Sequence, residues 1–374
     1  MLYTATVTVL SLLASAGLTL AGWGNPVAVA HLAFAVGIVP LIFAAMSHFV
    51  PVLTRTGDPG RTIVLVPLGA QLAGALAAAA LAGLVPRGFL HLAALAEFLL
   101  AAALLSWIAS RVRACLGTPH PGWRWYGTAL GCLMLAMAVI PPLVASAGLY
   151  ASFRAFHLHL NVLGLVGLSA LGTLPVLLPT ALGKPDPEAA VWLRRRLWPV
   201  AGGAMVVAIG SAFAWHMAAA GGAILFVVAL SLAGQWLRRF GLSALWRDGG
   251  AGSLAMAVLG LVVALIAGVA HAVGAAPARP AIAVWGAGFL LPLVTGALSQ
   301  LLPVWRWPGP ATPARTLMRT RLAAGGQWRG FLFVAAAVAL VFGESAWGGG
   351  LAASGLGLFV LALVRAVRGP ASAR

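Results

Sequence analysis

The chain has 374 residues, of which 62% are hydrophobic and 8% are charged, and its mean hydropathy is +1.02. This composition leaves too little polar surface to cover a water-soluble globule, so we expect an all-α integral membrane protein. The formal net charge of +17 would suggest a nucleic-acid partner in a soluble protein. Here the arginines stand in short segments between apolar runs, where they act as topology signals, so the expected partner is the lipid bilayer and not a nucleic acid.

Twelve apolar runs are long enough to span a bilayer, which takes about 20 residues as a helix. They are separated by Gly, Pro or Arg and lie near residues 2–22, 27–53, 62–85, 88–111, 126–149, 154–182, 197–218, 220–240, 252–274, 280–304, 328–346 and 348–367. The pattern predicts twelve transmembrane helices in a single membrane domain over 1–374. The first run has no basic segment before it, so we expect a retained helix and not a cleaved signal.

The distribution of basic residues predicts the orientation. Of the 23 Lys and Arg residues, only Arg87, Arg154 and Arg279 fall in odd-numbered loops. Because loops rich in Lys and Arg stay on the cytoplasmic side, both termini are expected in the cytoplasm, in a bacterial-type inner membrane.

An internal repeat relates the second, sixth and tenth helices. Residues 39–57, VPLIFAAMSHFVPVLTRTG, align without a gap with residues 291–309, LPLVTGALSQLLPVWRWPG, at a shift of 252. A shift of 128 carries Pro51 onto Pro179, at a similar Pro-rich exit. The chain is therefore expected to contain three pseudo-repeated units of four helices, near 1–122, 123–249 and 250–374.

Histidines are the main candidates for a site, because an imidazole inside a membrane is costly without a partner. Six of the eight are expected in one layer near the outer helix ends: His31, His91, His157, His159, His216 and His271. The shift of 128 places His31 on His159, so two units offer an imidazole at equivalent positions. His157 and His159 are two residues apart and point to different sides of a helix, so both cannot face one centre. The alternative for His91, His216 or His271 alone is an interfacial side chain with its polar tip among the headgroups.

Imidazole ligands suit haem iron or copper, whereas the two cysteines, Cys115 and Cys132, do not cluster. Arg154 and Arg279 are expected beside the same layer, where a guanidinium pairs with a haem propionate or, alternatively, with a lipid headgroup. Glu97 is the only acid well inside a predicted span, and it is either a proton-handling group or a structural hydrogen-bond donor.

The arrangement in three groups of four helices, and a second helix that carries His31 and closes on Thr54-Arg55-Thr56, resemble the haem-copper oxidase subunit I superfamily and its relatives in the NnrS family. The resemblance implies haem b with His31 as an axial ligand, and a copper position near helices six and seven. His159 or His157, together with His216, would stand near that copper, and His159 or His271 would supply the second axial ligand.

The chain departs from that superfamily at the tenth helix, which has no histidine, and it lacks both a histidine pair on helix seven and the cross-linked tyrosine motif. Proton-pumping oxygen reduction is therefore not expected. The expected work is redox, nitric-oxide or copper handling, with a redox partner or a small gas ligand. The alternatives are a metal-free carrier or oxidase-assembly partner on the same scaffold, where a carrier would need broken helices around a midplane cavity. A major-facilitator transporter would instead show a twofold repeat of six helices.

Overall fold

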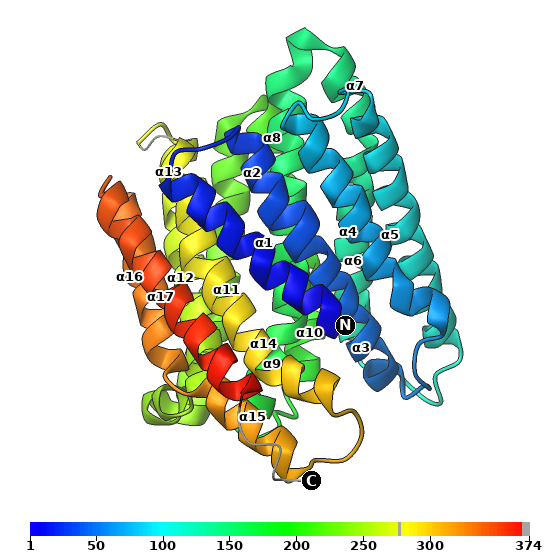
Figure 1. Cartoon of the computed structure of the whole chain (residues 1–374), viewed down its shortest axis with the longest axis vertical. Helices are drawn as coiled ribbons and strands as arrows, with labels where there is room; N and C mark the ends of the chain where they lie inside the picture. The colour runs from blue at the N-terminus through cyan, green and yellow to red at the C-terminus, as the bar shows by residue number, and fades with distance from the viewer. Residues whose placement is uncertain (276–277, 369–374) are drawn as a thin grey trace. The chain divides into compact units, whose positions relative to one another are not determined.

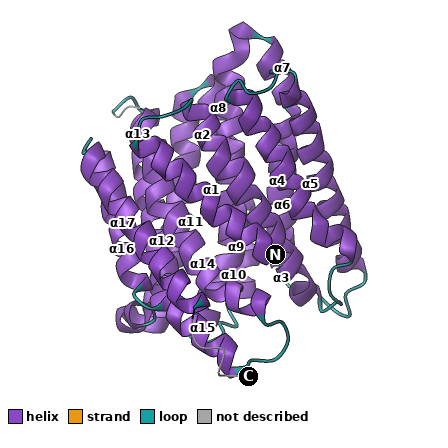
Figure 2. Cartoon of the chain, viewed as in Figure 1, coloured by secondary structure: helices purple, strands orange, loops and turns teal. Residues whose placement is uncertain are grey.

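The structure is a computed structural model that describes the backbone of residues 1–275 and 278–368 and the side chains of 1–275 and 281–368. Helices and loops account for all of this part of the chain, and it contains no strand (Figure 2). Twelve helical segments in it are long and apolar enough to cross a membrane. The predicted all-α, twelve-helix membrane architecture is therefore confirmed, and many exposed leucines and valines on these helices are suited to contact with lipid.

The chain forms two compact units, the first of which comprises Met1–Thr173 and Ala190–Ala214. Figure 1 labels the helices of the chain. Its elements are α1 (Leu2–Leu20), α2 (Pro26–His31), η1 (Leu32–Ile38), α3 (Val39–Thr54), α4 (Arg61–Leu81), α5 (Phe89–Arg113), α6 (Gly122–Ala138), α7 (Ile140–Ala145), η2 (Ala147–Leu149), α8 (Tyr150–His159), η3 (Leu160–Gly167), the start of α9 (Leu168–Ala181) and nearly all of α10 (Ala189–Phe213). The predicted fifth span is interrupted at Val139, because Pro141 and Pro142 lack the N–H groups that would continue α6.

The second unit comprises Leu174–Ala189 and the residues from Trp215 onward. Its elements are the end of α9, α11 (Trp215–Arg247), α12 (Gly249–Ala272), α13 (Ala278–Trp285), η4 (Gly286–Leu290), α14 (Leu291–Arg306), α15 (Pro313–Ala323), α16 (Gly326–Val341) and α17 (Ser345–Val367). Helix α15 lies where the sequence predicts a loop; its first turn is capped by the hydroxyl of Thr312, which accepts the N–H of Arg315.

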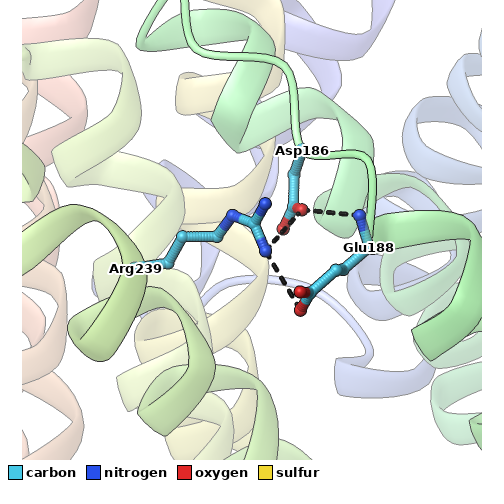
Figure 3. Close-up of polar contacts among 3 residues, drawn as sticks. All are labelled: Asp186, Glu188 and Arg239. Atoms are coloured by element: carbon cyan, nitrogen blue, oxygen red, sulfur yellow. Dashed lines mark hydrogen bonds and ion pairs between the residues drawn. The ribbon is translucent and has the colours of Figure 1, made fainter.

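An ion-pair cluster joins the α9–α10 loop to α11 within the second unit (Figure 3). Nη1 of Arg239 lies 3.1 Å from Oδ1 of Asp186 and 3.0 Å from Oε2 of Glu188. Oδ1 of Asp186 also accepts the backbone N–H of Glu188, so this aspartate orders the loop directly before α10.

Three spans contain a π-helical segment, a rare conformation that is frequent at functional sites. The segments η1, η3 and η4 lie in the second, sixth and tenth spans. Segments η1 and η3 begin 128 residues apart, and η1 and η4 end 252 residues apart, the two shifts found in the sequence. This recurrence accords with the sequence repeat, while the division into three four-helix units remains a prediction.

Each π-helical segment is approached closely by a neighbouring helix. A Cβ atom at Gly74 of α4 would collide with the carbonyl oxygen of Ala35 in η1, and one at Gly260 of α12 would collide with that of Gly288 in η4. At Gly164 of η3 the Cβ would lie 2.7 Å from the Cβ of Cys132 in α6. Only glycine permits these contacts, which hold a neighbouring helix against each π-helical segment.

Candidate functional site

The structure brings together the imidazole rings of His31, the last residue of α2, and His157 of α8. The ring centroids lie 6.5 Å apart, and the ring planes are within 11° of parallel. Both residues belong to the first compact unit. The ring that meets His31 is therefore that of His157, whereas the sequence repeat relates His31 to His159.

The hydrogen bonds of the two rings define their tautomers. Nδ1 of His31 lies 2.8 Å from the carbonyl oxygen of Val27, and Nδ1 of His157 lies 3.0 Å from that of Ala136. Because a carbonyl oxygen only accepts, each Nδ1 carries the hydrogen and donates it. In the neutral ring the lone pair is then on Nε2, the arrangement found in histidines that ligate a metal while the other nitrogen is held by a carbonyl.

The carbonyl oxygen that orients His157 is available because α6 ends two residues later, at Ala138. The last four carbonyl groups of a helix have no partner within it. The carbonyl of Ala136 is one of these, and it receives the Nδ1–H of His157 from across the bundle. Sequence reasoning missed this partner, although the Pro141-Pro142 pair marks the helix end that provides it.

The start of α2 positions His31 in a similar way. The side-chain oxygen of Asn25 accepts the N–H of Val27, and Pro26 occupies the first helical position. The amide of Asn25 also donates to the carbonyl oxygen of Leu81, which ties the start of α2 to the end of α4. These two contacts of Asn25 fix the start of α2, and with it the position of His31 at the end of that helix.

The histidine pair has the chemistry of a two-nitrogen metal site. Two imidazoles bound to opposite sides of one metal, with metal–nitrogen bonds of about 2 Å, have ring centroids roughly 6 Å apart. The observed centroid separation of 6.5 Å is close to that value. Imidazole nitrogen is a ligand for both haem iron and copper, so the donor set fits either group.

His159 repeats the local geometry of His31. Its Nδ1 lies 2.8 Å from the carbonyl oxygen of Ala155, four residues earlier, as that of His31 does from Val27. Both residues are followed directly by a π-helical segment. The equivalence of His31 and His159 expected from the repeat is therefore reproduced locally, while a ligand role for His159 remains a prediction.

The other candidates of the first unit are spread along its helices. Arg154 is exposed on α8, three residues before His157, and His91 is exposed in the first turn of α5. Glu97 is buried two turns further along α5. The structure thus places Arg154 close along the helix to the histidine pair, and it places His91 at an exposed helix end, as expected of an interfacial side chain.

In the second unit, His216 is exposed in the first turn of α11, and its neighbour Trp215 meets the ring of His271 edge-on at 5.0 Å. Arg279 belongs to α13, but its side chain lies outside the described residues. Within the described part of the chain, no three His, Cys, Asp or Glu residues are grouped so as to hold a metal ion. The metal roles of His91, His216 and His271 remain predictions.

Comparison of the sequence with protein-family models and with curated proteins gives no match. The chemistry of the site is therefore inferred from its own residues and their geometry.

Proposed function

We propose that the protein binds a redox metal cofactor, haem b or copper, between His31 and His157 and that it transfers electrons or handles copper or nitric oxide at that metal. One observation carries the proposal: two imidazoles from separate helices lie near-parallel with centroids 6.5 Å apart, each with its Nδ1 held by a carbonyl oxygen. In this tautomer each ring has its lone pair on Nε2, the nitrogen that a metal would take.

The donor set favours electron transfer among these activities. If His31 and His157 both held a haem, the group would supply electron transfer and would leave no position for a gas. The protein's part is to hold both rings at a fixed spacing and to keep the site among apolar side chains. The carbonyl groups of Val27 and Ala136 orient the two rings through their Nδ1 atoms.

Arg154 supports a haem in particular. It lies on the same helix as His157, three residues earlier, so the two side chains share one face of α8. Its guanidinium is exposed and makes no ion pair among the described residues. In the proposal it pairs with a haem propionate, for which Arg has the matching bidentate geometry.

An optical spectrum and a metal analysis of the purified protein test the proposal. We expect a haem Soret band, or copper near one atom per chain, that is lost in both His31→Ala and His157→Ala. His120→Ala is the control, because His120 lies in the loop between α5 and α6, outside the predicted histidine layer, and it should keep the cofactor. Protein that is folded yet contains neither haem nor copper would refute the proposal and leave the metal-free carrier or assembly role.

A second pair of variants separates the two neighbouring histidines. The ring contact described here predicts that His157→Ala loses the cofactor while His159→Ala keeps it. Loss in His159→Ala with retention in His157→Ala would show that the equivalence of His31 and His159, and not the observed ring pair, identifies the ligands.

A further inference from the structure

Helix α15 carries two arginines on one side. Arg315 and Arg319 are four residues apart, so they are neighbours on the helix surface, with Cβ atoms about 5–6 Å apart. Nη1 of Arg315 donates to the carbonyl oxygen of Gly309, and Nη2 of Arg319 donates to that of Ala181, the last residue of α9. All four residues belong to the second unit. Two positive charges are thus held one turn apart.

The position of α15 is fixed by its buried side and by its C-terminal end. Met318 is 4% exposed and Leu322 is 0% exposed. From α16, Nη1 of Arg329 donates to the carbonyl oxygen of Ala324 at 2.7 Å, and Nη2 donates to that of Leu322 at 2.9 Å. Gly325, between the two helices, has a φ of 68°, the left-handed conformation that lets the chain turn sharply. The two arginines therefore project from a helix whose place in the unit is fixed.

The connections and the composition of α15 place it at the depth of the lipid headgroups. Residues 307–312 join it to α14, and residues 324–325 join it to α16. Both α14 and α16 belong to segments that are long and apolar enough to cross a membrane. With three arginines in PARTLMRTRLA, α15 is costly to bury in hydrocarbon, whereas an amphipathic helix is stable in the plane of the headgroups.

No carboxylate of the described residues pairs with either arginine. The ion pairs found there join Arg239 to Asp186 and to Glu188. These are the acids nearest to Ala181 along the chain, and both already contact a cation. Lys184, exposed three residues after Ala181, adds another positive charge to this region. Because like charges one turn apart on a helix repel each other, an anion between them is favourable.

We propose that Arg315 and Arg319 bind the phosphate group of an anionic phospholipid at the membrane surface. Each guanidinium has five N–H donors, and the carbonyl groups of Gly309 and Ala181 each take one of them. The remaining donors match the two anionic oxygens of a phosphodiester in bidentate geometry.

The place of α15 favours a lipid over a free phosphate ion. Basic residues beside the ends of spanning helices recognise anionic headgroups, and the acyl chains of a lipid bound there lie along the spanning helices. The site belongs to the second unit, so it does not depend on a cofactor at His31 and His157 in the first.

Native mass spectrometry of the full chain, purified in detergent and depleted of lipid, tests this surface. The probes are phosphatidylglycerol and phosphatidylcholine with the same acyl chains, so only the headgroup differs. We expect phosphatidylglycerol to bind more tightly. Its dissociation constant should rise about tenfold in Arg315→Gln and in Arg319→Gln, because each variant loses charge-assisted hydrogen bonds. Equal binding of the two lipids by the wild-type protein would overturn the proposal.

Arg87→Gln is the matched control, because it removes the same charge from an exposed position in the first unit and should keep the wild-type affinity. The same effect of all three substitutions would show that only the total charge matters, and the assigned site would be wrong. Arg315→Lys keeps the charge without the planar fork, so its affinity for phosphatidylglycerol should fall between those of the wild-type protein and Arg315→Gln. Wild-type affinity in both Arg315 variants would contradict the site.

Two further measurements separate the lipid from a free ion and binding from folding. Inorganic phosphate at the concentration of the lipid should leave phosphatidylglycerol bound, and complete displacement would refute a lipid site. The thermal unfolding midpoint without lipid shows that each variant is folded. Because Arg315 donates to the loop directly before its own helix, its substitutions carry the test even where Arg319→Gln fails to fold.

Discussion

The side-chain amide of Asn161 donates a hydrogen bond to the carbonyl oxygen of His157, one turn earlier, at 2.8 Å. The same nitrogen lies 3.4 Å from Nε2 of His157. Since the Nδ1 of this histidine donates to Ala136, its Nε2 can only accept, so Asn161 approaches the lone pair that a metal would use.

Asn161→Leu tests that competition. Removing the amide leaves the Nε2 lone pair to the metal, so we expect the cofactor to be retained and to resist extraction better than in the wild-type protein. The lost hydrogen bond should lower the free energy of unfolding by about 1 kcal/mol. Loss of the cofactor as complete as in His157→Ala would instead show that Asn161 is needed to orient the ring.

Gly164→Ala tests the packing of the π-helical segment η3. The added methyl group would lie 2.7 Å from the Cβ of Cys132, so α6 and the sixth span must separate. We expect a loss of about 1–3 kcal/mol in stability, as for other overpacked sites, and a weakened contact between His157 and Ala136. The thermal unfolding midpoint in detergent and the cofactor content measure the two effects.

Gly131→Ala is the matched control for this substitution, because Gly131 lies on α6 next to Cys132 and no atom of another element lies within 4 Å of the added Cβ. It should be neutral or slightly stabilising, since alanine is the better helix former. Equal effects of the two substitutions would show that the approach of Gly164 to Cys132 does not limit the packing.

His120 makes stability depend on pH in a predictable direction. Burial, and to a smaller extent the positive charge of Arg194, lower the pKa of His120. Its Nδ1 also accepts the backbone N–H of Gly122 at 3.3 Å, which requires the unprotonated nitrogen. The unfolded chain therefore binds this proton more readily than the folded chain does.

As pH falls through about 6.5, the ordinary pKa of histidine, the unfolded state gains the proton first and stability decreases. Above that pH both states are neutral and the contribution is constant. We expect His120→Gln to remove part of the loss between pH 8 and pH 5, measured by thermal unfolding. A steeper acid loss in the variant than in the wild-type protein would contradict this sign.

Asp186→Asn tests the ion-pair cluster with Arg239. The aspartate side chain is 2% exposed, whereas that of Glu188 is 66% exposed, so solvent screens the second pair far more. The side-chain oxygen of asparagine can still accept the N–H of Glu188, so the substitution removes the negative charge and keeps this hydrogen bond. We expect a loss of about 1–2 kcal/mol for Asp186→Asn and little change for Glu188→Gln. Equal effects would mean that burial does not distinguish the two carboxylates.

The number and type of the helices could be predicted because each depends on a local property. A run of about 20 apolar residues spans the bilayer whatever its neighbours are. The helix predicted near residues 62–85 is found as Arg61–Leu81, and the one near 88–111 as Phe89–Arg113. Helix α15 was missed because its amphipathic sequence, with three arginines in eleven residues, resembles a basic loop.

The histidine partners could be predicted only in part. The sequence repeat relates His31 to His159, and the two share a local hydrogen bond and a following π-helical segment. Their equivalence does not say which ring faces which, because two residues with equivalent places in separate helices need not touch. The resemblance of this chain to the haem-copper oxidases therefore remains an expectation drawn from the motifs and the helix count of this sequence.

The sequence by itself determined that this is a membrane protein with twelve segments long and apolar enough to span a bilayer, because the hydropathy of each segment depends on that segment alone. It also determined which few polar side chains lie within those segments. The tertiary structure alone decided that the ring of His157 meets that of His31. That contact depends on where α6 ends, on close glycine contacts and on π-helical turns that alter the direction of side chains, and none of these follows from apolar periodicity.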